Sequence, residues 1–241
     1  MSGFDPVGSE RFLAALSVVS RAVVGPSRIV MACVDVLAVQ RAAIAVGVTE
    51  IGWEVLCASD SVADRFEALQ VTAGQGPGID AAVRGEVVVV EDLALIHNRW
   101  PLLAAAMPPG ETGAVYSIPL QAGAVRLGVL DLFREKPGLL DGIEWAAASS
   151  VAMMVTMILL SDQSADAESA EFVLGQWWSS APRTREIHQA SGMVAVQLGV
   201  PVRDAYSRLQ AHAFARGFTL AEVAADVVAR RLRFGPGPET S

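Results

Sequence analysis

The sequence predicts an α+β domain, built on an antiparallel sheet with flanking helices, followed by a small all-α domain of three helices. The length of 241 residues fits two compact domains better than one. A hydrophobic fraction of 52% with only 18% charged residues supports sizeable cores and argues against a disordered chain. The expected parts are an N-terminal segment at 1–24, the α+β domain at 25–160, a helical junction at 161–182, the three helices at 183–234 and a flexible tail at 235–241.

The charge of the chain changes sign near its C-terminal end. Residues 183–234 hold eight arginines against four acidic residues, a net charge of +4, whereas residues 1–182 have a net charge of −11. A cationic helical module attached to an acidic body is expected to meet an anionic partner.

Short apolar runs bounded by turn residues predict the sheet. The expected elements are an amphipathic helix at Arg28–Gln40, a hairpin of Ala42–Val48 with Trp53–Ala58, strands at Val83–Val90 and Val115–Leu120, and a strand at Ala124–Phe133 that returns through Gln121–Gly123. Antiparallel hairpins interleaved with helices indicate a sheet with helices on one face.

An apolar stretch at Trp145–Leu160 predicts a long helix, which Asp141 and Glu144 begin as a cap pair. Its sixteen residues are shorter than the ~20 that a membrane span needs. No positive flank sets an orientation. We therefore expect a buried helix without a membrane partner, which also supplies the seam of a homodimer and continues through Ser161–Gly175. In the junction, Trp177 and Trp178 are expected to pack against a neighbouring surface.

Residues that could carry chemistry do not form a catalytic or metal-binding set. Cys33 and Cys57 lie in apolar surroundings, as expected of reduced thiols in a cytoplasmic protein. The histidines, at positions 97, 188 and 212, are far apart, and no cysteine or carboxylate pattern completes a metal site. The N-terminus lacks the basic and apolar runs of a signal peptide. We expect a cytoplasmic protein that is not an enzyme.

The C-terminal segment shows the spacing of three short amphipathic helices. Gly199 and Pro201 separate the first helix from the second, Gly217 fits the end of the second, and Thr219 with Glu222 forms a capping box for the third. Helices of this length are marginal alone, so their apolar stripes are expected to pack together or on a second copy.

The same segment resembles an ANTAR domain, a three-helix RNA-binding module of bacterial transcription antiterminators. The resemblance rests on Gln189-Ala190, Gly192-Met193, Asp204-Ala205, Leu209, Ala213 and Leu220-x-x-Val223-Ala224. Two positions depart from the family pattern: Gln210 and Ser191 stand where many members have basic residues. The charge available for RNA is therefore thinner than in many relatives.

Residues 28–160 resemble a GAF domain, a sensory module found fused to ANTAR modules in actinobacteria. The resemblance rests on Ala58-Ser-Asp60, Gly74-Gln-Gly-Pro-Gly78, Asp80-Ala81, Asp92-Leu93, Trp100-Pro101, Pro119-Leu120 and Gly128-Val-Leu130. It implies a sensor whose pocket holds a small-molecule ligand or none, and the sequence leaves both open. Gly78 stands where relatives often have cysteine, so thiol chemistry there is absent. The glycine-rich run is interpreted as a turn at the pocket mouth.

Together the two resemblances imply a homodimeric, signal-responsive antitermination regulator that binds paired hairpins in nascent RNA and acts on the transcription machinery indirectly. The candidate RNA contacts are Gln189, Gln197, Arg203, Arg208, Gln210, His212, Arg216 and Phe218. Arginines contact phosphates, whereas an exposed aromatic ring stacks on a splayed base. The alternative is a dimeric protein-interaction adaptor that has lost RNA binding. Duplex DNA also stays open as a target, because arginines on helices do not separate the two nucleic acids.

Overall fold

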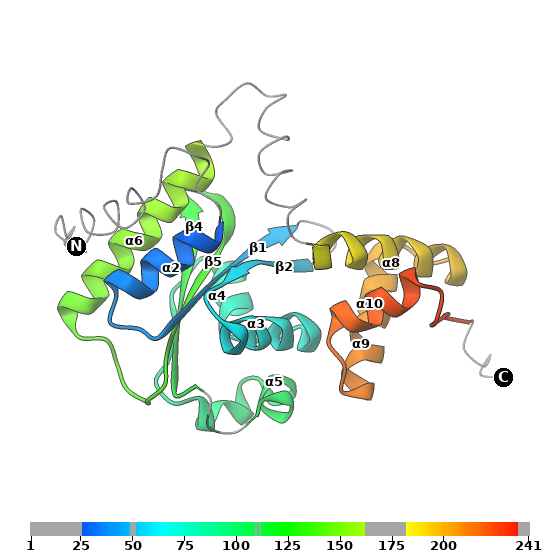
Figure 1. Ribbon diagram of the computed structural model, residues 1–241, viewed down its shortest axis with the longest axis horizontal. Coiled ribbons are helices and arrows are strands. Elements are labelled where there is room, and N and C mark those ends of the chain that lie inside the picture. Colours follow the sequence, from blue (N-terminus) through cyan, green and yellow to red (C-terminus); the bar gives the residue numbers. More distant parts are fainter. Residues whose placement is uncertain (1–25, 49–51, 109, 111, 162–181, 236–241) are drawn as a thin grey trace.

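The computed structural model describes residues 26–48, 52–108, 110, 112–161 and 182–235. A sheet covered by helices forms the N-terminal domain, and three helices lie beside it at the C-terminal end (Figure 1). The predicted continuation of the long helix beyond residue 161, both junction tryptophans and the N-terminal segment fall outside the described residues.

The sheet has five strands in the order β2-β1-β5-β4-β3, and every neighbouring pair is antiparallel. The strands are β1 Arg41–Val48, β2 Gly52–Ala58, β3 Val88–Val90, β4 Ala114–Ala122 and β5 Val125–Arg134. Both predicted hairpins are present, and Gly123 takes the positive φ of 57° that the turn between β4 and β5 requires.

Helices cover both faces of this sheet, so the expectation of helices on one face is wrong. Helices α2 (Pro26–Val36) and α6 (Gly142–Ser161) pack on one face, whereas α3 (Ser61–Ala73), α4 (Pro77–Arg84) and α5 (Pro101–Ala106) cover the other, with the 3-10 helix η1 (Leu93–Asn98) beside α5. In β1, residues 42, 44 and 46 enter the first core and residues 43 and 45 the second. An apolar residue at every position, rather than at every second one, is what a sheet buried on both sides requires.

The predicted strand at Val83–Val90 is half wrong. Its first two residues end α4, and only Val88–Val90 forms a strand. Pro77 occupies the first turn of α4, and Gly85 ends that helix in the left-handed conformation with φ 71°. The run Gly74–Gly78 thus forms the turn between α3 and α4 together with the first two residues of α4.

Helix α6 is the one described helix long and apolar enough to cross a membrane by length and composition. In the protein it lies along the sheet, where Ala148, Val151, Val155 and Leu159 are buried in the first core. Asp141 caps the helix by accepting from the amides of Ile143 and Glu144, both at 2.8 Å, as the sequence predicted.

The C-terminal helices are α8 (Pro182–Leu198), α9 (Val202–Arg216) and α10 (Leu220–Val228), and all three agree with the predicted spacing. Their shared core is centred on Val194, Leu209, Leu220 and Val227. Gly217 ends α9 with φ 70°, and Thr219 and Glu222 form the predicted capping box of α10. Because Val71 of α3 also enters this core, the three helices pack directly on the N-terminal domain.

Candidate functional site

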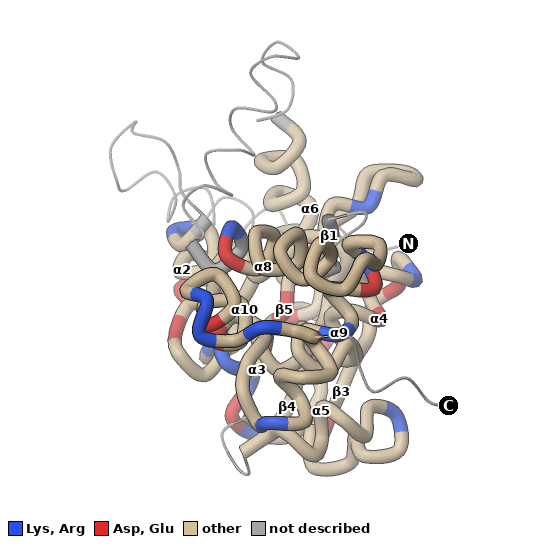
Figure 2. The backbone as a smooth tube through the Cα atoms, turned by 90° about the vertical axis from the view of Figure 1, so that its right-hand side faces the viewer, with Lys and Arg blue, Asp and Glu red and all other residues tan. Residues whose placement is uncertain are grey.

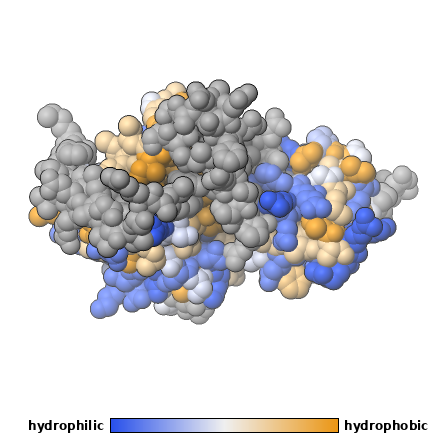
Figure 3. Space-filling model, turned by 45° about the horizontal axis from the view of Figure 1, so that its top comes forward, coloured by the Kyte–Doolittle hydropathy of each residue, from blue (hydrophilic) through white to orange (hydrophobic). Residues whose placement is uncertain are grey.

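The predicted contact residues do not form a single surface. Five of them are exposed, namely Gln189, Arg203, Arg208, Arg216 and Phe218, and the other three are partly buried by neighbours. Basic positions occur at the start of α8, along α9 and in the segment after α10 (Figure 2). Hydrophilic atoms cover much of the outer end of this part of the molecule, with apolar atoms between them (Figure 3).

Helix α9 has three distinct faces, which follow from its 100° step per residue. Ala205, Leu209 and Ala213 are fully buried in the shared core. Arg203 and Gln210 lie on a second face, which is turned toward the N-terminal domain. Arg208 lies more than a quarter turn from both and faces solvent. The structure therefore separates Arg208 from Arg203 and Gln210 on this helix.

The turn after α9 brings a cation and an aromatic ring together at the surface. Arg216 is the last residue of the helix, Gly217 reverses the chain, and Phe218 follows with 52% of its surface exposed. The amide of Phe218 donates to the Ala213 carbonyl at 3.0 Å, which holds the turn in place. A positive charge beside an unstacked ring suits a phosphate with its neighbouring base.

Gln197 and His212 both contact Phe234, in the segment after α10. This role of Phe234 was not predicted from the sequence. The Gln197 side-chain oxygen accepts from the Phe234 amide at 2.9 Å. The His212 and Phe234 rings meet edge to face with centroids 5.2 Å apart. These contacts are internal to the module, so both predicted residues also have a structural role.

The same segment carries three exposed arginines, at positions 230, 231 and 233, which were not among the predicted contacts. Arg231 pairs with Asp226 at 2.7 Å. Arg230 has φ 60° and is the only non-glycine residue with a positive φ in the described ranges. These three arginines are close together in the sequence after a capped helix, and this pattern could have indicated them as candidate contacts.

The three helices are joined to the N-terminal domain by hydrogen bonds that satisfy helix ends on both sides. The Gln210 amide donates to the Val71 carbonyl at 2.6 Å, near the C-terminal end of α3. In return, the Thr72 hydroxyl oxygen accepts from the Leu220 amide at 3.0 Å, at the first residue of α10. Terminal turns of helices leave backbone groups without partners, so each domain supplies what the other lacks.

An ionisable pair adds to this contact. The His188 ring nitrogen Nε2 meets the Glu54 carboxylate of β2, and Glu54 is 8% exposed. Tyr206 lies nearby, where burial and the Glu54 charge raise its pKa. Trp53 and Val55 pack against the shared core from the same strand. The face of α9 that carries Gln210 is therefore covered in part by the N-terminal domain.

Both departures from the ANTAR pattern occur at packed positions. Ser191 is fully buried and donates to the Ile187 carbonyl at 2.8 Å. Gln210 is bonded to Val71 across the domain contact. Ser191 thus lies in the interior of the module, and Gln210 takes part in the contact between the domains.

The N-terminal domain holds a buried polar network between α3, the start of α4 and the sheet. Gln70 Nε2 lies 3.1 Å from both the Glu67 and Asp131 carboxyls, and the Gly78 amide donates to Gln70 Oε1 at 2.8 Å. Burial, followed by the nearby Asp131 charge, raises the pKa of Glu67 well above 4.5. Burial likewise raises the pKa of Asp131. Both carboxyls are therefore protonated more readily than exposed carboxyls are.

The remaining candidate groups have structural partners. Asp60 caps α3, Asp92 caps η1, and Asp80 pairs with Arg99 at 2.9 Å. Burial raises the pKa of Cys57 to about 12 and that of Cys33 further, so neither thiol is an activated nucleophile. Within the described ranges, no group of three His, Cys, Asp or Glu residues is placed to hold a metal ion.

Comparison with known families identifies the C-terminal helices. Residues 182–228 match the family model of the ANTAR domain. These residues form an ANTAR domain. The match spans α8, α9 and α10 as described above. No curated protein sequence matches the chain.

The N-terminal domain is similar in structure to several solved proteins. They include the GAF domain of an Acinetobacter phosphoenolpyruvate-protein phosphotransferase, which is 12% identical and covers 68% of this chain and 98% of that chain with a TM-score of 0.49. The corresponding domain from Coxiella burnetii is 14% identical, with 64% and 96% covered and a TM-score of 0.46. A free methionine-R-sulfoxide reductase from Neisseria meningitidis, solved with its substrate, is 14% identical, with 69% and 100% covered and a TM-score of 0.46.

The antiparallel order β2-β1-β5-β4-β3 with helices on both faces is the GAF-like architecture that the sequence motifs predicted. The protein thus has a domain of GAF-like architecture, called the sensor below after the resemblance in the sequence, followed by an ANTAR domain. This domain content is regulatory and favours a non-enzyme.

Proposed function

We propose that this protein is a signal-responsive transcription antitermination regulator that works in the cytoplasm as a homodimer. Its ANTAR domain binds paired hairpins in a nascent transcript, and the hairpin that would terminate transcription is thereby disfavoured. The transcription machinery responds indirectly, through the RNA. A dimer suits a pair of hairpins, because engagement of one raises the effective concentration of the second domain at the other.

The exposed turn of Arg216 and Phe218, together with Arg208, supports this proposal most strongly. These side chains belong to an ANTAR domain, lie on its surface and lack ion-pair partners within the described residues. RNA loops present closely spaced phosphates and unstacked bases, which such residues bind by charge and stacking.

The dimer is proposed to form through the outer faces of α2 and α6. Met153, Met157 and Ile143 of α6 are 60%, 61% and 80% exposed, and Met31 of α2 is 48% exposed. Exposed apolar side chains grouped on one side of a long helix favour an interface. A second copy, related by a two-fold axis, would cover them.

One observation supports the alternative function, a dimeric protein-interaction adaptor that has lost RNA binding. The face of α9 that carries Gln210 contacts the sensor rather than solvent, and charge is reduced at both family positions noted above. An ANTAR domain permanently held in this way would serve protein contacts. The two candidates differ in whether the intact dimer binds RNA.

The deciding experiment compares binding of the purified protein to a two-hairpin RNA and to duplex DNA of equal length. RNA binding that exceeds DNA binding, and that Arg208→Ala and Arg216→Ala each weaken about fivefold to tenfold, supports the proposal. Arg84→Ala removes an exposed charge from the sensor and serves as the control. Equal binding to DNA would redirect the proposal to duplex targets. Absence of binding to either nucleic acid by the folded full-length protein would favour the adaptor.

A further inference from the structure

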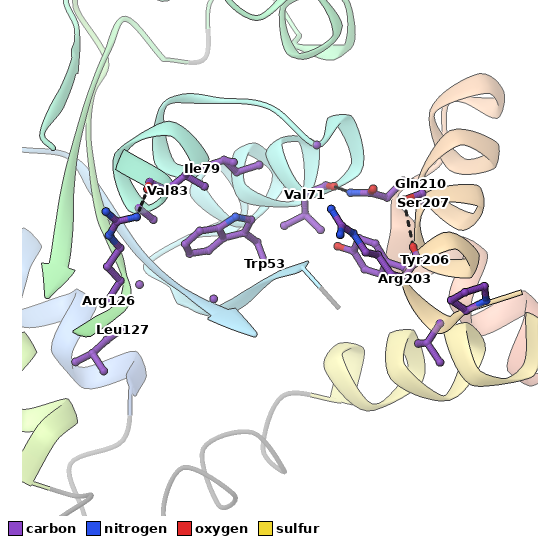
Figure 4. A pocket seen from close by; sticks show the side chains of 16 residues that line it. Trp53, Val71, Ile79, Val83, Arg126, Leu127, Arg203, Tyr206, Ser207 and Gln210 are labelled. Carbon is purple, nitrogen blue, oxygen red and sulfur yellow. Dashed lines mark hydrogen bonds between the residues drawn. The ribbon is translucent and has the colours of Figure 1, made fainter. Parts of the chain in front are cut away.

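A cleft of about 1130 Å³ lies where the sensor meets the ANTAR domain. One wall comes from α3, α4 and the first residues of β5, and the other comes from the N-terminal half of α9 (Figure 4). Trp53 of β2 lies between the two walls, and the Arg203 side chain extends toward it from α9. Neither domain encloses this space without the other.

The charge of the cleft is opposite to that of the chain. Two arginines, Arg126 and Arg203, line it, and no acidic residue does so in the described part of the protein. The whole chain nevertheless carries 26 acidic residues and a net charge of −8. Neither arginine has an ion-pair partner among the described residues. A cleft lined by one sign of charge concentrates ligands of the other sign.

Arg126 is held in position by backbone groups. Its guanidinium donates to the Val83 carbonyl and approaches the Arg84 carbonyl at 3.4 Å, both at the C-terminal end of α4. These acceptors are neutral and leave the charge of the arginine in place. Arg203 is exposed on α9 and free to move toward a ligand. One cation is therefore fixed and the other adaptable.

The rest of the lining is largely apolar and suits a flat ring. Trp53 lines the cleft beside Gly47, and a methyl group built at Gly47 would lie 3.4 Å from the end of the ring. The glycine therefore leaves room next to the tryptophan. Ile79 and Leu127 lie beyond the tryptophan, and Tyr206 closes the α9 side. An aromatic face with apolar flanks and few polar groups is typical of small-molecule sites.

We propose that this cleft binds an organic anion, a planar apolar body that carries a carboxylate or a phosphate. The body stacks on Trp53, and the acidic group pairs with Arg203 on one side of the ring, while Arg126 on the other side adds positive charge to the cleft (Figure 4). Since α9 supplies part of the site, such a ligand stabilises the docked arrangement of the two domains. This proposal makes no assumption about RNA binding, so its test is independent of the test of the proposed function.

Two matched pairs of probes test the proposal on the full chain by ligand-observed NMR titration. Naphthaleneacetate is compared with naphthaleneacetamide, and adenosine monophosphate with adenosine, so that each pair differs in charge on one ring system. The proposal predicts saturable binding of at least one anion, with its neutral counterpart at least about tenfold weaker, equivalent to about 1.4 kcal/mol. Which anion binds decides between a carboxylate and a phosphate ligand.

Substitutions locate the binding. Arg203→Gln is expected to weaken binding of the anion about tenfold, and Arg126→Gln about twofold to threefold because it acts at longer range. Arg185→Gln changes an exposed arginine of α8 outside the cleft and is expected to leave the affinity unchanged. Circular dichroism and thermal melting establish that each variant is folded. Absence of saturable binding by every anion would overturn the proposal. So would equal binding of the neutral probes, or affinity that the two cleft variants leave unchanged.

Discussion

The sensor and the ANTAR domain differ in how they bury their apolar side chains. The sensor has a core on each face of its sheet and tolerates two carboxyls, Glu67 and Asp131, in its interior. The ANTAR domain has one small core, which Val71 of the sensor completes. The larger unit is self-sufficient, whereas the smaller one depends on its neighbour for apolar cover and for helix-end partners. That dependence gives the sensor a physical means to influence the ANTAR domain.

The largest expected effect comes from truncating the smaller core. Leu209 is fully buried, so Leu209→Ala removes apolar packing and leaves a cavity, at a cost of about 2–5 kcal/mol. The account predicts that α8, α9 and α10 lose protection against hydrogen exchange while the sheet keeps it. Mass spectrometry of the exchanged protein measures both regions at once.

The matched substitution in the larger unit is Leu130→Ala, at an equally buried position of β5. It is expected to destabilise the sheet, and with it the ANTAR domain that the sensor supports. If instead Leu209→Ala unfolded the sheet as well, the claimed independence of the sensor would be wrong.

Replacing the buried carboxyl of Glu67 by an amide should change the free energy of unfolding by a smaller amount and in the opposite direction, toward higher stability. The pKa of Glu67 is raised on folding, so its contribution to stability is complete below its ordinary value of 4.5 and is lost as pH rises through the folded value. Glu67→Gln keeps the shape without needing the proton. We expect the variant to gain roughly 1 kcal/mol over the wild type in neutral solution, and the difference to vanish in acid.

Urea denaturation of both proteins across a pH series measures this difference. Glu86→Gln, at an exposed position outside the network that joins Gln70 to Asp131, provides a control. A constant offset between wild type and Glu67→Gln at every pH would show that Glu67 does not retain its proton in the folded protein.

Loosening the contact between the domains should have the smallest effect on global stability. Gln210→Ala removes the hydrogen bond to Val71, which is worth about 1 kcal/mol. The Leu220 amide, which is bonded to Thr72 across the same contact, should then exchange faster. Gln189→Ala, an exposed glutamine on α8, should leave that exchange rate unchanged. Unaltered Leu220 exchange in Gln210→Ala would mean that the amide contact does not hold the domains together.

Local sequence signals predicted most of the secondary structure, because the relevant forces act over a few residues. Asp141 and Thr219 mark helix starts through their own side chains, and Gly123 and Gly217 mark reversals by the positive φ that glycine favours. The misassigned Val83 shows the limit. A valine-rich run after a short helix has β propensity, yet Pro77 and Gly85 fix a helix that includes it.

Long-range contacts could not be predicted in this way. Gln210 was expected to meet RNA, but its amide lies against Val71, 139 positions away in the chain. The predicted role of Arg203, Arg208, Arg216 and Phe218 at the RNA stays a prediction, with their positions now known. The network around Gln70 had no motif, because its members come from α3, α4 and β5 and meet only in the folded sheet.

The salt dependence of RNA binding tests the central claim most directly. Affinity of the protein for a two-hairpin RNA is measured over a series of salt concentrations, for the wild type and for the Arg208→Ala, Arg216→Ala double variant. Removal of one arginine–phosphate pair lowers the slope of log affinity against log salt by about 1, so the slope of the double variant should fall by about 2. A slope that stays unchanged in the double variant, with RNA still bound, would contradict the proposed RNA-binding surface.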